Sequence, residues 1–298
     1  MTDAISATAG TGGFLEKVRR RWHDGRTLLC IGLDLELDRL PEAHKGSGSS
    51  GGDVETAFFA FNAAIIDATA DLVCAYKPNA AFYERHGAAG WNALARTIAY
   101  IHSRYPDIPV LLDAKRGDIG STAEAYAAAI FDTLGADAVT LHPYLGGDAL
   151  QPFLKRADRG CFILVHTSNP GADEFQHLTV HASGEVMAQP LYIAVARTVA
   201  HDWNTNGNCG LVVGATYPEQ IRMVRQAVGD LPLLIPGIGA QGGDLAASVT
   251  GGLDNQGAGL LLSASRSVIY ASGGADFAEV ARGEAQRLRE AIEGLRRQ

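Results

Sequence analysis

Residues 109–122 read Pro-Val-Leu-Leu-Asp-Ala-Lys-Arg-Gly-Asp-Ile-Gly-Ser-Thr, an apolar run that ends in a cluster of opposite charges. Side chains alternate between the two faces of a strand, so Asp113 and Lys115 are predicted to lie on one face at its carboxyl end. Gly117 then permits a turn, and Asp118 follows within reach of the pair. The stretch therefore predicts a carboxylate, an ammonium group and a second carboxylate packed together. The alternative is an ordinary surface ion pair, which would contribute only about 0–1 kcal/mol.

The same order of elements, an apolar strand followed by a helix, recurs along the chain. Apolar runs without polar alternation are expected as eight strands over residues 27–33, 72–76, 110–114, 138–141, 161–165, 210–213, 231–235 and 259–262. Helical spacing is expected over residues 14–22, 54–68, 90–105, 123–134, 149–156, 190–203, 219–228, 244–249 and 275–296. Strands of this kind are typical of a parallel sheet that is buried on both faces.

Eight repeats favour an α/β protein of the closed (β/α)₈ type, a TIM barrel, over an open doubly wound sheet. The open sheet would need a glycine-rich phosphate loop after its first strand, where this chain has Asp34 and Leu35. We expect a single barrel domain over residues 14–298, preceded by a flexible tail over residues 1–13. A Gly/Ser-rich segment at 46–53 is expected as a flexible loop, and the polar segment 168–184 as a lid over the site.

The composition argues against several classes of partner. A formal net charge of −8 leaves no general basic face for nucleic acid or for an anionic membrane. No apolar run reaches membrane-spanning length, and residues 1–13 have no signal-like apolar core, so we expect a cytoplasmic protein. The cysteines lack the spacing of a zinc or redox motif and are expected as buried free thiols: Cys30, Cys74, Cys161 and Cys209.

Polar residues follow nearly every predicted strand, at the end where barrels of this type carry their active sites. They are Asp34, Lys77, Asn79, Asp113, Lys115, His142, Ser168, Gln241 and Arg266. Because a single buried charge is costly, we expect an alternating network of Lys77, Asp113, Lys115 and Asp118. A purely structural ion-pair network is the alternative. For His142 and His166, a hydrogen bond to loop backbone is as plausible as a role in the site.

A phosphate site is predicted in the last quarter of the chain. The glycines of the stretch Gly237-Ile-Gly239-Ala-Gln-Gly-Gly243 can aim backbone N–H groups at an anion, and Arg266 follows the eighth strand with a guanidinium. Barrel enzymes commonly hold phosphate at this place. A plain tight turn is the alternative for the glycines, and the paired arginine favours phosphate.

Several motifs together resemble the orotidine 5′-monophosphate decarboxylase family, over residues 30–270. They are Gly32-Leu-Asp34, Lys77-Pro-Asn79 with Ala81-Phe-Tyr-Glu84, Asp113-Ala-Lys-Arg-Gly-Asp118, Thr167-Ser-Asn-Pro-Gly171, Pro236-Gly-Ile-Gly-Ala-Gln-Gly-Gly-Asp244 and Arg266-Ser267. The Thr-Ser-Asn-Pro-Gly form and the longer loops are similar to the bacterial subgroup found in mycobacteria and their relatives.

The resemblance implies a homodimeric enzyme that decarboxylates orotidine 5′-monophosphate to uridine 5′-monophosphate, in de novo pyrimidine synthesis, without cofactor or metal. The resemblance makes four residues catalytic: Lys77, Asp113, Lys115 and Asp118. Asp113 would face the departing carboxylate, and Lys115 would protonate carbon 6. Among the substrate-binding residues, Asp34, together with Lys77, would hold the ribose hydroxyls and Ser168 the pyrimidine amide. Gln241 and Arg266 would hold the phosphate, and Asn79, Gly237 and Gly239 also belong to the binding group. Asp118 and Thr122 would be supplied to the neighbouring subunit's site.

Three other functions remain open from the residues. A barrel decarboxylase or aldolase for sugar phosphates could use the same Asp-x-Lys-x-x-Asp pattern with magnesium, but it would need a second carboxylate where Lys77 stands. A Schiff-base aldolase acting through Lys115 is disfavoured because flanking carboxylates keep the amine protonated. A catalytically silent phosphate-binding barrel would need Arg266 and the glycines but no charge network opposite them.

Overall fold

The computed structural model describes residues 12–44, 51–181, 188–238 and 244–297. Eight parallel strands form one sheet, in the order β2-β1-β10-β9-β8-β5-β4-β3. Its two end strands meet through bridges between Tyr76 and Val110 and between Asn79 and Asp113, which close the sheet into a barrel. The strands are β1 (Leu29–Gly32), β2 (Ala75–Lys77), β3 (Leu111–Arg116), β4 (Ala138–Leu141), β5 (Gly160–His166), β8 (Cys209–Val213), β9 (Leu233–Pro236) and β10 (Leu260–Ala264). The predicted TIM barrel is confirmed.

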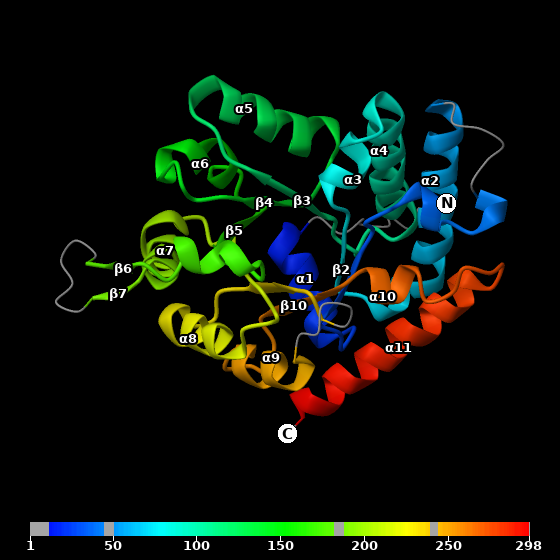
Figure 1. Ribbon diagram of the computed structural model, residues 1–298. Helices are drawn as coiled ribbons and strands as arrows, with labels where there is room; N and C mark the ends of the chain where they lie inside the picture. Colours follow the sequence, from blue (N-terminus) through cyan, green and yellow to red (C-terminus); the bar gives the residue numbers. More distant parts are fainter. Residues whose placement is uncertain (1–11, 45–50, 182–187, 239–243, 298) are drawn as a thin grey trace, which may run out of the picture.

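Helices surround the barrel, as Figure 1 shows in a view along its axis. They are α1 (Phe14–His23), α2 (Gly51–Thr69), α3 (Ala80–Glu84), α4 (Gly87–Arg104), α5 (Gly120–Ala128), α6 (Gly147–Leu154), α7 (Leu191–Thr198), α8 (Pro218–Val228), α9 (Leu245–Gly252), α10 (Arg266–Ile269) and α11 (Phe277–Arg296). Single π-helical turns at Ala129–Thr133 and Val199–Trp203 continue α5 and α7. None of the helices in the described ranges is long and apolar enough to cross a membrane.

Three predicted segments differ from the structure or fall outside it. Most of the predicted tail, residues 1–11, and residues 46–50 of the predicted Gly/Ser loop lie outside the described residues. Residues 51–53 of that loop already belong to α2. The first turn of a helix tolerates glycine, because the packing of the remaining turns stabilises the whole helix. Of the predicted lid, residues 182–184 lie outside the described residues; the rest contains a 3₁₀ turn (Pro170–Glu174) and β6 (Thr179–Val180). Strand β6 pairs with β7 (Gln189–Pro190), which follows the lid, and the two strands project beside α7 in Figure 1.

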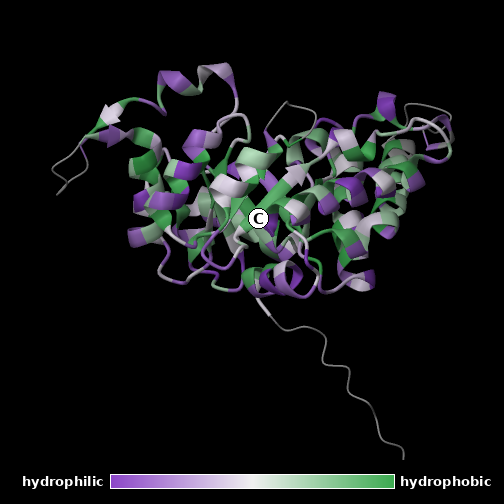
Figure 2. Ribbon diagram, turned by 90° about the horizontal axis from the view of Figure 1, so that it is seen from below, coloured by the Kyte–Doolittle hydropathy of each residue, from purple (hydrophilic) through white to green (hydrophobic). Residues whose placement is uncertain are grey.

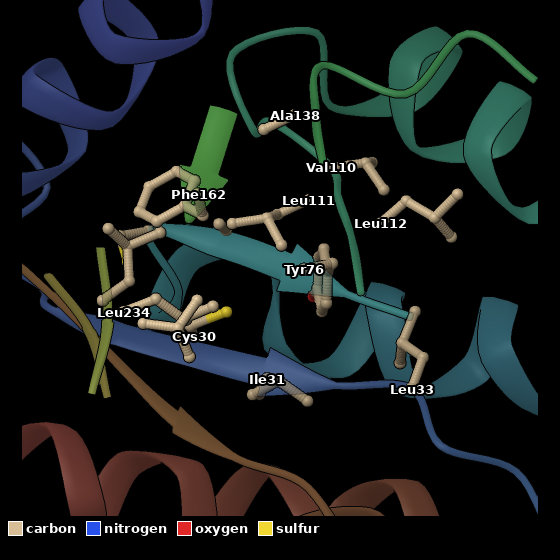
Figure 3. Packing of buried hydrophobic residues seen from close by; sticks show 14 of the residues in the cluster. Cys30, Ile31, Leu33, Tyr76, Val110, Leu111, Leu112, Ala138, Phe162 and Leu234 are labelled. Atoms are coloured by element: carbon tan, nitrogen blue, oxygen red, sulfur yellow. The ribbon is translucent and has the colours of Figure 1, made fainter. Parts of the chain in front are cut away.

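The barrel interior is apolar. In Figure 2 the central strands are mostly hydrophobic, whereas the surrounding helices mix hydrophobic and hydrophilic residues. Figure 3 shows Cys30, Leu111, Phe162 and Leu234 of the core, which come from β1, β3, β5 and β9 and are all fully or almost fully buried. Side chains from many strands therefore fill the barrel as a packed core.

Helix α1 closes the amino end of the barrel. Phe14 packs edge-to-face on Phe162, with ring centroids 5.6 Å apart. Lys17 Nζ donates to Asp137 Oδ1 at 3.0 Å, directly before β4, and Asp137 Oδ2 accepts the backbone N–H of Val110 at 2.8 Å. Because this end is sealed by packed and paired groups, the carboxyl ends of the strands are the place that remains for a site.

Candidate active site

A pocket opens at the carboxyl ends of the barrel strands and gathers most of the predicted site residues. Those that line it are Asp34, Lys77, Asn79, Asp113, Lys115, Ser168, Gly237 and Arg266. Asp118 and Thr122 are not part of this lining, and Gly239 and Gln241 lie outside the described residues. Within one chain, the structure therefore brings together two thirds of the predicted site.

Asp113 is the centre of a buried charge network. Its Oδ2 lies 3.2 Å from Lys77 Nζ, and its Oδ1 lies 2.6 Å from Lys115 Nζ. Burial opposes ionisation of Asp113, but the two ammonium charges outweigh it and hold its pKa well below the usual range. Burial likewise opposes the charge of Lys77, but Asp113 and Asp34 outweigh that effect and raise the pKa of this lysine. The shifted pKa values of Asp113 and Lys77 therefore both favour the charged form of the pair.

Strand β3 does not deliver these side chains by simple alternation. Leu112 pairs with Val139 and Arg116 with Leu141, so three residues of β3 stand opposite the single residue Thr140 of β4. Within this bulge, Lys115 has a φ of 47°, in the left-handed region that non-glycine residues rarely adopt. The predicted meeting of Asp113 and Lys115 occurs, but a bulge produces it, as bulges beside active sites commonly do.

Asp118 does not extend the network within its own chain. Its Oδ1 accepts the backbone N–H of Ile119 at 2.8 Å, and no ion pair from the described part of the chain reaches it. The expected four-membered chain of charges therefore ends at Lys115, because the turn at Gly117 carries Asp118 away from the pocket. His142 Nε2 lies 3.1 Å from the Gly117 carbonyl oxygen, so this histidine bonds the turn rather than the pocket.

The remaining lining residues supply uncompensated polar groups. Asp34 Oδ1 is buried without a hydrogen-bond partner among the described residues. Arg266 is exposed at the first turn of α10, and Gly237, whose φ is 98°, directly follows β9 and lines the same pocket. An unpaired buried acceptor and an exposed guanidinium in one pocket are suited to a ligand that carries both hydroxyl groups and an anion.

Sequence reasoning missed Gly214 and Thr140. A Cβ on Gly214 would lie 2.0 Å from Ser168 Oγ, so glycine at the end of β8 is what leaves room for Ser168. Thr140 is the hydroxyl-bearing residue of a strand that reads Ala-Val-Thr-Leu. A polar residue inside an otherwise apolar strand was the signal that could have identified it.

His166 at the end of β5 is buried against His177, with the two Nε2 atoms 2.8 Å apart. Burial and the neighbouring His177 lower the pKa of His166 to about 4. We expect stability to fall as the pH decreases from about 6.5 to 4, by up to about 3 kcal/mol, because the unfolded chain binds a proton there that the folded chain does not. Urea unfolding across this range should show that His166→Phe loses this part of the pH dependence. The control is His201→Gln at an exposed histidine, and an unchanged slope in His166→Phe would contradict the assignment.

Comparisons with known proteins identify the family of this chain. The sequence profile of the orotidine 5′-phosphate decarboxylase / HUMPS family matches residues 27–281. An orotidine 5′-phosphate decarboxylase of Herpetosiphon aurantiacus is 55% identical over 273 residues, which are 92% of this chain and 95% of that protein. Another, from Thermomicrobium roseum, is 53% identical over 286 residues, or 96% of each chain.

A solved structure of Leishmania donovani OMP decarboxylase is also similar. It is 39% identical in sequence, with a TM-score of 0.80, and the match covers 96% of this chain and 99% of that chain. The resemblance drawn from the motifs is confirmed over almost the whole length. The chain therefore belongs to the orotidine 5′-phosphate decarboxylase / HUMPS family.

Proposed function

We propose that this chain decarboxylates orotidine 5′-monophosphate to uridine 5′-monophosphate, the last step of de novo pyrimidine nucleotide synthesis. The observation that carries the proposal is the array of Lys77, Asp113 and Lys115, which lies in one pocket with Arg266. Its chemistry suits a reaction that generates negative charge on carbon and has no cofactor to absorb it. The decarboxylases at 53–55% identity support the same reaction.

In the proposed mechanism, Lys115 is both the stabilising cation and the acid. The bond between carbon 6 and the carboxylate breaks, carbon dioxide leaves, and the electron pair remains on carbon 6. An ammonium group already held in place stabilises this charge without reorganisation, and its proton is then transferred to carbon 6. Asp113 Oδ1, 2.6 Å from Lys115 Nζ, keeps that group oriented. Asp113 would also face the departing carboxylate.

The binding roles follow the polar groups of the pocket. Asp34, whose Oδ1 is buried without a partner among the described residues, would accept a hydrogen bond from a ribose hydroxyl, and the Lys77 ammonium group would donate one to the ribose. Ser168 would bond the pyrimidine amide, Arg266 the phosphate with Gln241, and Asn79 and the two glycines at 237 and 239 would complete the site. Phosphate binding remote from carbon 6 can supply energy for closing the segment 168–184 over the substrate.

We further propose a homodimer in which Asp118 and Thr122 serve the partner's site. Support comes from the surface around Asp118, where Ile119 is 60% exposed, Tyr144 84% and Leu145 43%. Large apolar side chains of this kind are commonly covered by a protein partner.

The four buried free cysteines fit a reducing compartment, and we place the enzyme in the cytoplasm.

The test is the absorbance of orotidine 5′-monophosphate followed over time with purified protein, before and after exhaustive chelation. We expect decarboxylation to persist after chelation, because lysine ammonium groups occupy both carboxylate oxygens of Asp113 and would repel a metal ion. Loss of activity that magnesium restores would favour the sugar-phosphate alternative instead. Absence of turnover in the untreated protein would contradict the proposed function.

A further inference from the structure

The bulge in β3 is held by one hydroxyl group from the neighbouring strand. Thr140 Oγ1 accepts the backbone N–H of Lys115 at 2.9 Å and donates to Asp113 Oδ1 at 2.8 Å. A threonine hydroxyl has one hydrogen to donate and lone pairs to accept, so this arrangement uses it in both directions. Thr140 is 1% exposed and does not line the pocket, so it reaches the reaction only through these two residues.

The contacts close a ring around Lys115. Its backbone N–H bonds Thr140, Thr140 bonds Asp113 Oδ1, and the same oxygen accepts from Lys115 Nζ at 2.6 Å. Thr140 of β4 is therefore connected to the backbone N–H of Lys115 directly and to its ammonium group through Asp113. The ring encloses a residue whose φ of 47° is unfavourable for any side chain with a Cβ.

We propose that Thr140 is a positioning residue for decarboxylation, which holds Lys115 in its left-handed conformation and Asp113 in the matching rotamer. Without the hydroxyl, the Lys115 N–H loses its acceptor and Asp113 Oδ1 loses a donor, so the backbone of the bulge is less firmly held in the left-handed conformation. The ammonium group would then be displaced from the position of carbon 6. A displacement of about 1 Å in a catalytic group costs on the order of 100-fold in rate.

The chain offers a matched control at the opposite end of the barrel. Thr27 is fully buried, donates to the Leu72 carbonyl at 2.6 Å, and accepts the N–H of Leu29 at 3.2 Å. Its hydroxyl thus has the same pattern of one bond donated and one accepted, but Thr27 lies two residues before β1, at the amino end of the barrel, and does not line the pocket. Loss of either hydroxyl should lower stability, whereas only loss of the Thr140 hydroxyl should lower the rate.

The experiment compares Thr140→Ser with Thr140→Ala, which lack the same methyl group and differ only in the hydroxyl. This inference rests on the proposed function, so the readouts are kcat for orotidine 5′-monophosphate, calorimetric Kd for uridine 5′-monophosphate, and Tm. We expect Thr140→Ala to lower kcat roughly 100-fold with Kd within about 3-fold of wild type, and Thr140→Ser to restore most of kcat. Thr27→Ala should lower Tm and leave kcat unchanged.

Equal kcat values for Thr140→Ala and Thr140→Ser, with an active wild type, would overturn the positioning role while leaving the proposed function intact. An equal loss of kcat in Thr27→Ala would overturn it as well, because the effect would then be one of stability. A wild type without turnover would overturn the proposed function and the inference together. If Thr140→Ala does not fold, Thr140→Val provides the hydroxyl-free variant with the methyl retained, and its kcat is compared with that of the wild type, from which it differs only by a methyl in place of the hydroxyl.

Discussion

Lys115→Ala is expected to lose decarboxylation while it still binds uridine 5′-monophosphate. Lys115 carries the proposed proton and the proposed stabilising charge, and a preorganised charge and a general acid each contribute about 10²-fold or more, so a loss of at least ~10⁴-fold in kcat is expected. The phosphate and ribose groups on other strands remain, so binding persists. Single-turnover assays and calorimetry with the product nucleotide measure the two effects separately.

Two variants serve as controls for this result. Arg266→Ala should mainly weaken binding, because its guanidinium is placed for the phosphate rather than for carbon 6. Lys155→Ala removes an exposed lysine that lies 3.7 Å from Glu124 on the outer helices, and it should leave both constants unchanged. Normal turnover by Lys115→Ala would show that another group supplies the proton.

Mixing inactive Lys115→Ala with inactive Asp118→Ala is expected to restore activity. If each site takes Lys115 from one subunit and Asp118 from the other, a mixed dimer has one site with both defects and one with neither. Random exchange makes half of the dimers mixed, so about a quarter of all sites should recover if sites act independently. The assay is turnover after subunit exchange, with exchange itself verified by a mass or fluorescence label.

The matched control for this experiment is a mixture of Lys115→Ala with Asp113→Ala. These two residues are in contact within one chain, with Oδ1 2.6 Å from Nζ, so every site of a mixed dimer retains one defect. No recovery is expected there. Proven exchange without recovery in the Asp118 mixture would show that Asp118 serves its own chain.

The sequence was sufficient to predict the barrel because each strand is visible as a local apolar run and this run recurs along the chain. Residues 138–141 were predicted as a strand from an apolar run alone, and β4 occupies the same residues. A buried parallel strand needs apolar residues on both faces, so each of the eight left a visible run. The polar residues after those runs, such as Asp34 and Lys77, could be assigned to one pocket because parallel strands end at the same edge of a barrel.

What the sequence could not predict depends on contacts between segments. Helix α3 is five residues long, too short to show a period, and it forms beside α4, where a Cβ on Gly90 would lie 1.9 Å from the Tyr83 carbonyl oxygen. The bulge depends on the Thr140 hydroxyl of β4, and the period-two alternation of β3 alone cannot predict a contact with another strand. The direction of Asp118 is set by the turn at Gly117, and its use by a partner subunit stays a prediction.

The left-handed backbone of Lys115 affects how the thermal stability of this protein can be raised. Such a conformation costs a residue with a side chain on the order of 1–2 kcal/mol, whereas glycine adopts it readily. Glycine at this position would relieve the backbone strain, but it would also remove the ammonium group that lies 2.6 Å from the buried carboxylate of Asp113. Thermostable variants of this enzyme should be sought with turnover as a simultaneous requirement, because the side chain that the local backbone disfavours is the one that the chemistry requires.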